Sequence, residues 1–166
     1  MKKLFIVAGI LFASTNAFCQ GSLPVGKAQF NIGLGFSGWG VPVYGGIDFG
    51  VSHDITLGGE LSIRSYRENW KNNYYRHHII GVSANGNYHF NRILNIPSQF
   101  DFYAGLNLGF YSWNSPDGYP GDHTSGVGLG AQIGGRYYFT NRVALNLELG
   151  GGDVFSDGKI GITIKL

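Results

Sequence analysis

One short stretch has the residue types and spacing that covalent catalysis needs. His123 and Ser125 are two positions apart in the sequence His-Thr-Ser, so an imidazole base could activate a serine hydroxyl. The base of such a pair normally needs a third group to orient it, and Glu148 is the only glutamate that follows. Glu148 is predicted to point into the barrel, whereas His123 and Ser125 are predicted on the lipid-facing side, so Glu148 would not lie beside them. The sequence therefore favours ordinary loop polarity over catalysis for this pair.

Nucleotide and metal chemistry are less well supported. Gly33 to Gly38 match the pattern GxGxxG, but Trp-Gly-Val-Pro follows, so no helix opens to present its N-terminus to a phosphate. His77 and His78 are adjacent on a predicted strand and point to opposite faces, so they cannot bind one metal ion together.

Four aspartates lie in two predicted loops, where carboxylate oxygens could hold a divalent cation: Asp117, Asp122, Asp153 and Asp157. Aspartate beside Gly or Pro is also a common turn former, and this simpler explanation is preferred. We expect no cofactor and no metal site.

The first residues have the plan of a secretory signal peptide. Lys2 and Lys3 precede ten apolar residues, which are too few to span a bilayer as a helix. We predict a signal peptide at 1–19 and a single domain at 20–166, with cleavage after Ala17 or Cys19 left open. Lipid attachment to Cys19 is disfavoured because a bulky Phe18 precedes it.

Composition limits the remaining chain to a few classes. The sequence has 166 residues with 28 Gly, 15% aromatic and only 13% charged residues, which argues against a coiled coil, a disordered chain or a helical domain. Removal of Lys2 and Lys3 lowers Lys+Arg from 12 to 10, which equals the 10 Asp+Glu. A neutral mature chain has no basic patch for nucleic acid.

Hydrophobicity alternates with a period of two along most of the chain. Eight strands are predicted, at Lys27–Ser37, Pro42–Val51, Ile55–Tyr66, His77–Phe90, Phe100–Ser112, Gly126–Phe139, Val143–Gly151 and Lys159–Leu166. Tight turns such as 52–54 and 140–142 alternate with longer connections such as 67–76 and 113–125. This alternation predicts antiparallel neighbours, with both termini at the end of the short turns.

Each predicted strand has one face without Asp, Glu, Lys or Arg. The other face is rich in Gly and carries four acids and four bases: Asp48, Glu60, Arg64, Asp101, Arg136, Glu148, Lys159 and Lys165. Isolated buried charges need partners, so we expect these residues to form a structural charge network in the lumen. The tight turn at 140–142 places Gly134 opposite Glu148, which predicts a diagonal Arg136–Glu148 pair.

The two faces indicate which side meets solvent. A lipocalin-like soluble barrel would have its apolar face inside and a Lys- and Glu-rich face outside, whereas this Gly-rich polar face suits a crowded interior. The fold predicted is all-β, an eight-stranded antiparallel transmembrane β-barrel with up-and-down meander topology. Two aromatic girdles are predicted, one of Tyr88, Phe90, Phe100, Phe102, Tyr137 and Phe139 and one of Trp39, Trp70, Phe110 and Trp113.

Two segments carry a resemblance to a known family. The stretch GVGLGAQIGGRYYFTNR at 126–142, with VALNLELG after it, and the final strand KIGITIKL resemble small eight-stranded outer-membrane barrels of the OmpA/OmpX type. The resemblance covers about residues 27–166. It implies a place in the outer membrane of a bacterium with two membranes, in contact with lipid and lipopolysaccharide. It also implies assembly-machinery recognition of the C-terminal strand, where Leu166 departs from the more usual Phe.

This architecture implies no specific activity. We expect a non-catalytic envelope protein whose outer loops meet an extracellular ligand, with Trp70, Tyr74, Tyr75, Trp113 and Tyr119 as contact candidates. One alternative is a lipid-modifying enzyme, because the spacing of His123 and Ser125 is similar to that of outer-membrane lipid A deacylases. Another is a narrow channel, although eight strands leave room for little more than side chains. Inward tyrosines narrow the lumen further: Tyr44, Tyr103, Tyr111 and Tyr138.

Overall fold

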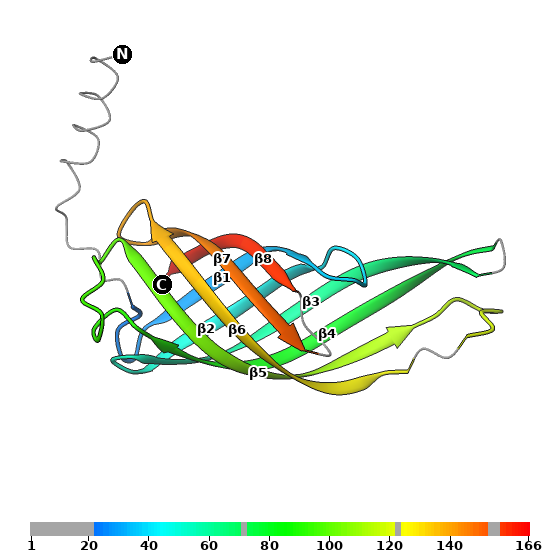
Figure 1. Ribbon diagram of the computed structural model, residues 1–166, viewed down its shortest axis with the longest axis horizontal. Helices are drawn as coiled ribbons and strands as arrows, with labels where there is room; N and C mark the ends of the chain where they lie inside the picture. The colour runs from blue at the N-terminus through cyan, green and yellow to red at the C-terminus, as the bar shows by residue number, and fades with distance from the viewer. Residues whose placement is uncertain (1–21, 71–72, 122–123, 153–156) are drawn as a thin grey trace, which may run out of the picture.

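The computed structural model describes residues 22–70, 73–121, 124–152 and 157–166, and they form a closed antiparallel barrel (Figure 1). The strands are β1 (Ala28–Phe36), β2 (Val43–Ser52), β3 (Ile55–Trp70), β4 (Asn73–His89), β5 (Phe100–Asn114), β6 (Gly126–Tyr138), β7 (Val143–Gly152) and β8 (Gly158–Lys165). Each strand pairs with its neighbours in the chain, and β1 pairs with β8 to close the barrel. No helix in the described part of the chain is long and apolar enough to cross a membrane. The predicted signal peptide at 1–19 lies outside the described residues.

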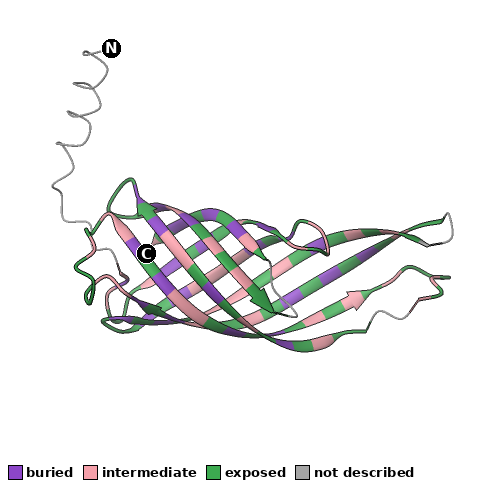
Figure 2. Ribbon diagram, in the orientation of Figure 1, coloured by how far each residue is buried: buried purple, intermediate pink, exposed green. Residues whose placement is uncertain are grey.

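Burial follows the alternation of the sequence. Buried and exposed residues alternate along the strands in Figure 2. On β5, Leu106 is 69% exposed while its neighbour Asn107 is 5% exposed. Large apolar side chains therefore cover the outside, and polar side chains, glycines and tyrosines fill the inside, as predicted.

The two ends of the barrel differ. At one end, called here the turn end, lie the connections 53–54, 90–99 and 139–142 together with the start of β1 and the end of β8. The opposite end, the hairpin end, carries the connection 37–42 and the ends at which β3 leads to β4, β5 to β6 and β7 to β8. Figure 1 shows the β3–β4 and β5–β6 hairpins projecting well beyond the other strands at the hairpin end.

The segment before β1 folds across the lumen at the turn end. Leu23 is 1% exposed, and the Gly26 amide donates to the Gly50 carbonyl. Gly50 lies on an inward position of β2, where a Cβ atom would collide with the backbone of Pro24. Glycine at position 50 therefore allows the segment to pack inside the rim.

The predicted outer loop at 67–76 is wrong, because most of it continues the β3–β4 ladder. The pairing runs from Ile55↔Tyr88 without interruption to Trp70↔Asn73. Aromatic residues favour extended structure, and each residue of one strand finds a direct partner on the other. The chain therefore presents a two-stranded wall at the hairpin end in place of an irregular loop.

The girdle predicted at the turn end is confirmed, whereas the other is partly wrong. Rings of Tyr88 and Phe90 lie 5.3 Å apart, and those of Phe100 and Tyr137 lie 5.2 Å apart, on the outside of the barrel. At the hairpin end Phe110 is exposed, but Trp39 and Trp113 pack against each other with ring centres 5.3 Å apart. Trp113 has the inward parity of Asp101 and Tyr103, so it cannot face lipid. The side chain of Trp70 lies outside the described structure.

Candidate functional site: lumen charges and the outer aromatic cluster

A buried ion-pair cluster occupies the lumen near the turn end. Arg136 of β6 contacts Asp101 of β5 at 3.0 Å and Asp48 of β2 at 3.1 Å, and it is 3% exposed. His89 of β4 adds a third contact, because its Nδ1 lies 2.7 Å from Asp101 Oδ1. Gln29 also donates to Asp48 at 3.0 Å. This base, two acids and the polar groups around them link strands on opposite sides of the barrel.

A second cluster lies nearer the middle of the lumen. Lys159 of β8 contacts Glu60 of β3 at 2.8 Å and Glu148 of β7 at 3.0 Å. The Tyr103 hydroxyl lies 2.9 Å from Glu148 Oε2 and 3.0 Å from Asn146 Oδ1. Lys159 therefore neutralises part of the charge of Glu60 and Glu148. The Tyr103 hydroxyl donates a hydrogen bond to the other carboxylate oxygen of Glu148.

The predicted Arg136–Glu148 pair is wrong, although the register behind it is confirmed. Gly134 does pair with Glu148, as the tight turn requires. The Tyr103 ring fills the space over Gly134 and separates the two charges: the Arg136 guanidinium lies 4.4 Å from the ring centre, and the hydroxyl of the same ring contacts Glu148. Arg136 instead pairs with Asp101, its direct neighbour on β5.

The remaining two predicted lumen charges stand apart from these clusters. Arg64 is buried toward the hairpin end, where its Nη1 donates to Ser37 Oγ at 3.0 Å. Lys165 lies at the turn end with its Nζ 4.0 Å from the centre of the Tyr138 ring. The eight charges therefore do not form one network, because six of them form two clusters and two lie elsewhere.

Neutral polar side chains fill the lumen between the charges, and the predicted lumen network did not include them. Gln132 donates to Asn87 at 2.6 Å and accepts a hydrogen bond from Asn107 at 2.7 Å. Thr56 contacts His89 at 3.0 Å. Each of these residues lies at an inward-facing position of its strand, so the two-residue alternation of the sequence could have identified it.

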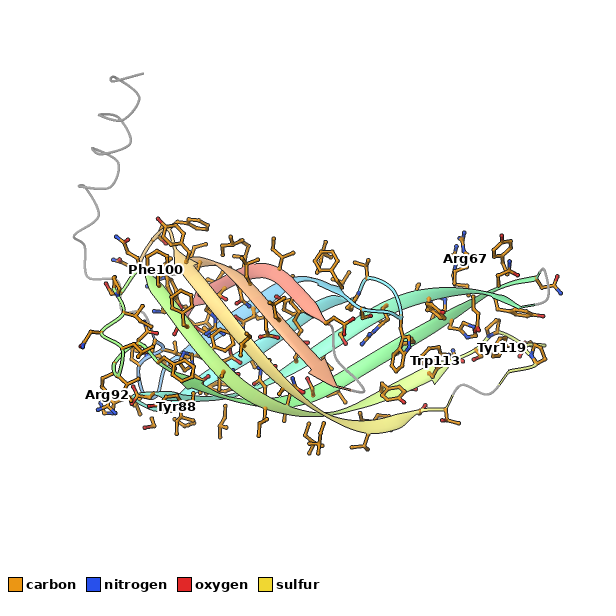
Figure 3. All side chains as sticks on the ribbon, in the orientation of Figure 1. Arg67, Tyr88, Arg92, Phe100, Trp113 and Tyr119 are labelled. Atoms are coloured by element: carbon orange, nitrogen blue, oxygen red, sulfur yellow. The ribbon has the colours of Figure 1, made fainter. Side chains whose placement is uncertain are left out.

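Above the lumen, at the hairpin end, an outer aromatic cluster joins the two long hairpins. It consists of Trp39, Tyr66, Tyr75, His77, Tyr111, Trp113 and Tyr119. Figure 3 shows Trp113 and Tyr119 on the hairpin that faces the β3–β4 wall. His77 is fully buried, with its ring centre 4.6 Å from that of Tyr119.

Hydrogen bonds fasten this cluster. The Tyr119 hydroxyl donates to Glu68 Oε2 at 2.7 Å, and His77 Nδ1 lies 3.0 Å from Ser115 Oγ. The β5–β6 connection is therefore attached to the inner face of the β3–β4 wall. His77 is the buried centre of this contact.

Of the predicted loop contacts, Tyr74 is the most accessible at 73% exposed. Tyr75, Trp113 and Tyr119 pack within the outer aromatic cluster and are only partly exposed. Trp70 is in the strand, but its side chain is not described. The surface available to a partner is thus smaller than predicted.

A cavity of about 630 Å³ opens beside the outer aromatic cluster. Its lining includes the rings of Trp39 and Tyr111 and the carboxylate-bearing Asp157. These residues come from β5 and from the connections after β1 and β7, so the cavity lies at the hairpin end.

The arrangement expected of a hydrolase is not assembled by the described residues. His123 lies outside them, and so do Asp122 and Asp153. The Ser125 hydroxyl accepts a hydrogen bond from the Trp113 amide at 3.0 Å, while Glu148 contacts Lys159 inside the lumen. Among the described residues, no group of three or more His, Cys, Asp or Glu is placed to hold a metal ion.

Known proteins resemble this chain in fold and not in sequence. No protein-family model and no curated protein matches the sequence. Among solved structures, the outer membrane protein OprG of Pseudomonas aeruginosa is similar with a TM-score of 0.64 at 9% identity, over 90% of this chain and 99% of that one. The N-terminal β-barrel domain of OprF from the same species gives 0.60 at 14% identity, over 86% and 98%. Neisserial surface protein A gives 0.58 at 14% identity, over 84% and 94%. The chain therefore has the fold of the small eight-stranded outer-membrane barrels.

Proposed function

We propose that the protein is an integral outer-membrane protein without catalytic activity, whose barrel supports the two long hairpins on the cell surface. The observation that carries this proposal is the combination of an apolar exterior and an ion-paired interior. Leu61, Leu106 and Leu129 are each more than 60% exposed, and such side chains have a favourable environment only in hydrocarbon. Closure of β1 on β8 makes the sheet continuous around the barrel, as a membrane span requires.

The filled lumen argues for a supporting role over transport. Arg136 and Lys159 each cross the lumen to acids on distant strands, and no more than 12% of any of these paired side chains is exposed. Moving an ion past these pairs would require breaking contacts between buried charges, which is costly. We infer that the lumen charges stabilise the barrel and do not line a conduit.

The exterior at the hairpin end favours a role in surface interaction. The outer aromatic cluster holds Ser115 and Tyr119 of the β5–β6 connection against the β3–β4 wall, so this part of the projecting surface is already positioned before any partner binds. A rigid surface loses less conformational entropy when it binds. We propose that Tyr74 and neighbouring residues of the wall meet extracellular molecules, and that the final strand is the segment the assembly machinery recognises.

Three measurements test the proposed function together. Membrane fractionation should place the mature chain in the outer membrane, and planar bilayers containing the purified barrel should show no discrete conductance steps. Mass spectra of lipid A from overexpressing cells should show no loss of acyl chains. Conductance steps that change in Arg136→Gln would establish a conduit, and loss of an acyl chain that depends on Ser125 would establish an enzyme.

A further inference from the structure

Two arginines lie directly opposite each other on the outer face of the β3–β4 wall. Arg67 and Arg76 are cross-strand partners, and both are exposed. Figure 3 shows Arg67 pointing away from the barrel. Like charges directly opposite each other destabilise a sheet unless an anion compensates them. Among the described residues, no carboxylate forms an ion pair with either arginine.

The pair lies just beyond the apolar belt. On the same face, Ile63 pairs with Ile80, then Ser65 pairs with His78, and Arg67↔Arg76 is the next outward pair. Ile63 and Ile80 are 61% and 56% exposed, and they are the last apolar pair before the polar ones. Four residues of a tilted strand rise about 10 Å along the barrel axis, which is comparable with the depth of a headgroup layer plus the reach of an arginine.

Among the described strand residues, the outer face around the pair carries no acid. The outward residues of β3, β4 and β5 beyond the apolar belt are Ser65, Arg67, Asn69, Tyr74, Arg76, His78, Ser112 and Asn114. The acid in this part of the wall is Glu68, which has the opposite parity and accepts a hydrogen bond from Tyr119 on the inner side. A positive strip of two arginines therefore lies just beyond the apolar belt.

We propose that Arg67 and Arg76 bind the phosphate monoester of a lipid headgroup in the leaflet at the hairpin end. The proposal rests on the proposed function, because it requires the apolar belt to lie in a bilayer. Each guanidinium can donate two parallel hydrogen bonds to phosphate oxygens, and a shared dianion removes the repulsion between the two arginines. His78, one pair closer to the belt, and Tyr74, one pair farther out, flank the headgroup.

The test uses the full mature barrel folded in decylmaltoside micelles, with dihexanoyl phosphatidic acid as the probe. The NMR signals of the Arg67 and Arg76 Nε–H groups should shift saturably as the probe is added. Dihexanoyl phosphatidylcholine, which lacks the monoester, should leave them in place. Arg76→Gln should weaken the affinity reported by Arg67 about fivefold or more, the effect of one cation at an anionic surface. Arg142→Gln, which removes an exposed arginine at the turn end, is the matched control and should preserve that affinity.

The other outcomes have separate meanings. Absence of shifts at both arginines, or equal weakening by Arg142→Gln, would overturn the site. Equal shifts with inorganic phosphate would overturn the lipid as its ligand and leave a free-anion site. A chain that stays folded and dispersed without detergent would overturn the proposed function instead, whatever the two arginines do.

Discussion

Arg136 is the residue whose removal should affect the barrel most. Its guanidinium is buried between Asp48 and Asp101, so Arg136→Gln leaves two buried carboxylates without their cation. We expect the free energy of unfolding to fall by about 3–5 kcal/mol. Urea-induced unfolding from lipid vesicles, followed by tryptophan fluorescence, measures this change.

Double-mutant cycles identify the partner of Arg136. Coupling between Arg136→Gln and Asp101→Asn should be strong, because the side chains are in direct contact. Coupling with Glu148→Gln should be much weaker, since Tyr103 separates the two charges. The opposite order of the two coupling energies would restore the pair that the sequence predicted.

The Asp54–Arg92 pair at the turn end makes a prediction about pH. Arg92 Nε donates to Asp54 Oδ2 at 2.9 Å, and this hydrogen bond lowers the pKa of Asp54 below its ordinary 3.8. A lowered folded-state pKa means that the pair stabilises the fold above the unfolded pKa, and that this stabilisation disappears as pH falls through the folded value.

An NMR titration of the Asp54 carboxyl carbon in micelles measures this effect. Arg92→Gln should raise the pKa of Asp54 toward the ordinary value, because the hydrogen bond that contributes most to the lowering is removed. Arg142→Gln, which removes another arginine from the same end of the barrel, should leave the titration unchanged. A pKa that does not respond to Arg92→Gln contradicts the contact.

Strand β6 depends on a glycine opposite a tyrosine. A Cβ atom at Gly134 would collide with the Tyr103 ring, which carries contacts to both lumen clusters. We expect Gly134→Ala to lower the free energy of unfolding by about 1–3 kcal/mol through overpacking. Gly151→Ala on β7 is the control, because open space surrounds that position and the change should stay within about 0.5 kcal/mol. Equal effects of the two variants would mean that the lost stability comes from the strand propensity of alanine and not from a collision with the tyrosine ring.

Strand β5 tests which part of the exterior meets lipid. Leu106 lies on the outer face in the middle of the strand, and Leu106→Arg should cost about 2–4 kcal/mol in unfolding from vesicles. Asn114 lies on the same face at the hairpin end, opposite His78, so Asn114→Arg should be nearly neutral. Comparable losses at both positions would place the boundary of the apolar belt elsewhere.

The asymmetry between the two ends predicts how the barrel sits in a cell. The hairpin end carries the projecting β3–β4 and β5–β6 hairpins, whereas the turn end holds both ends of the barrel domain (Figure 1). Proteinase K added to intact cells should cut within the connection 115–121 and spare the connection 90–99. Cutting confined to 90–99 would reverse the proposed orientation.

Alternation with a period of two was sufficient to predict much of this barrel. It identified eight strands, the apolar exterior and the glycine-rich interior, because in a strand each side chain's face depends only on its parity. Tight turns also determined local register, so the pairing of Gly134 with Glu148 follows from the sequence. The β3–β4 ladder was underestimated because its end has no aliphatic residues to continue the alternation, although cross-strand pairing sustains it to Trp70 and Asn73.

The partners of the lumen charges were decided by the closed tertiary structure. Arg136 reaches Asp48 across 88 positions of sequence, and Lys159 reaches Glu60 across 99. These contacts cross the lumen, so they depend on how β1 and β8 join and how far the strands are staggered, which no local pattern encodes. The alternation of inward and outward positions along each strand is enough to place Trp113 and Arg136 on the inner face. Which ring or carboxylate each one meets depends on the strands that closure brings opposite it.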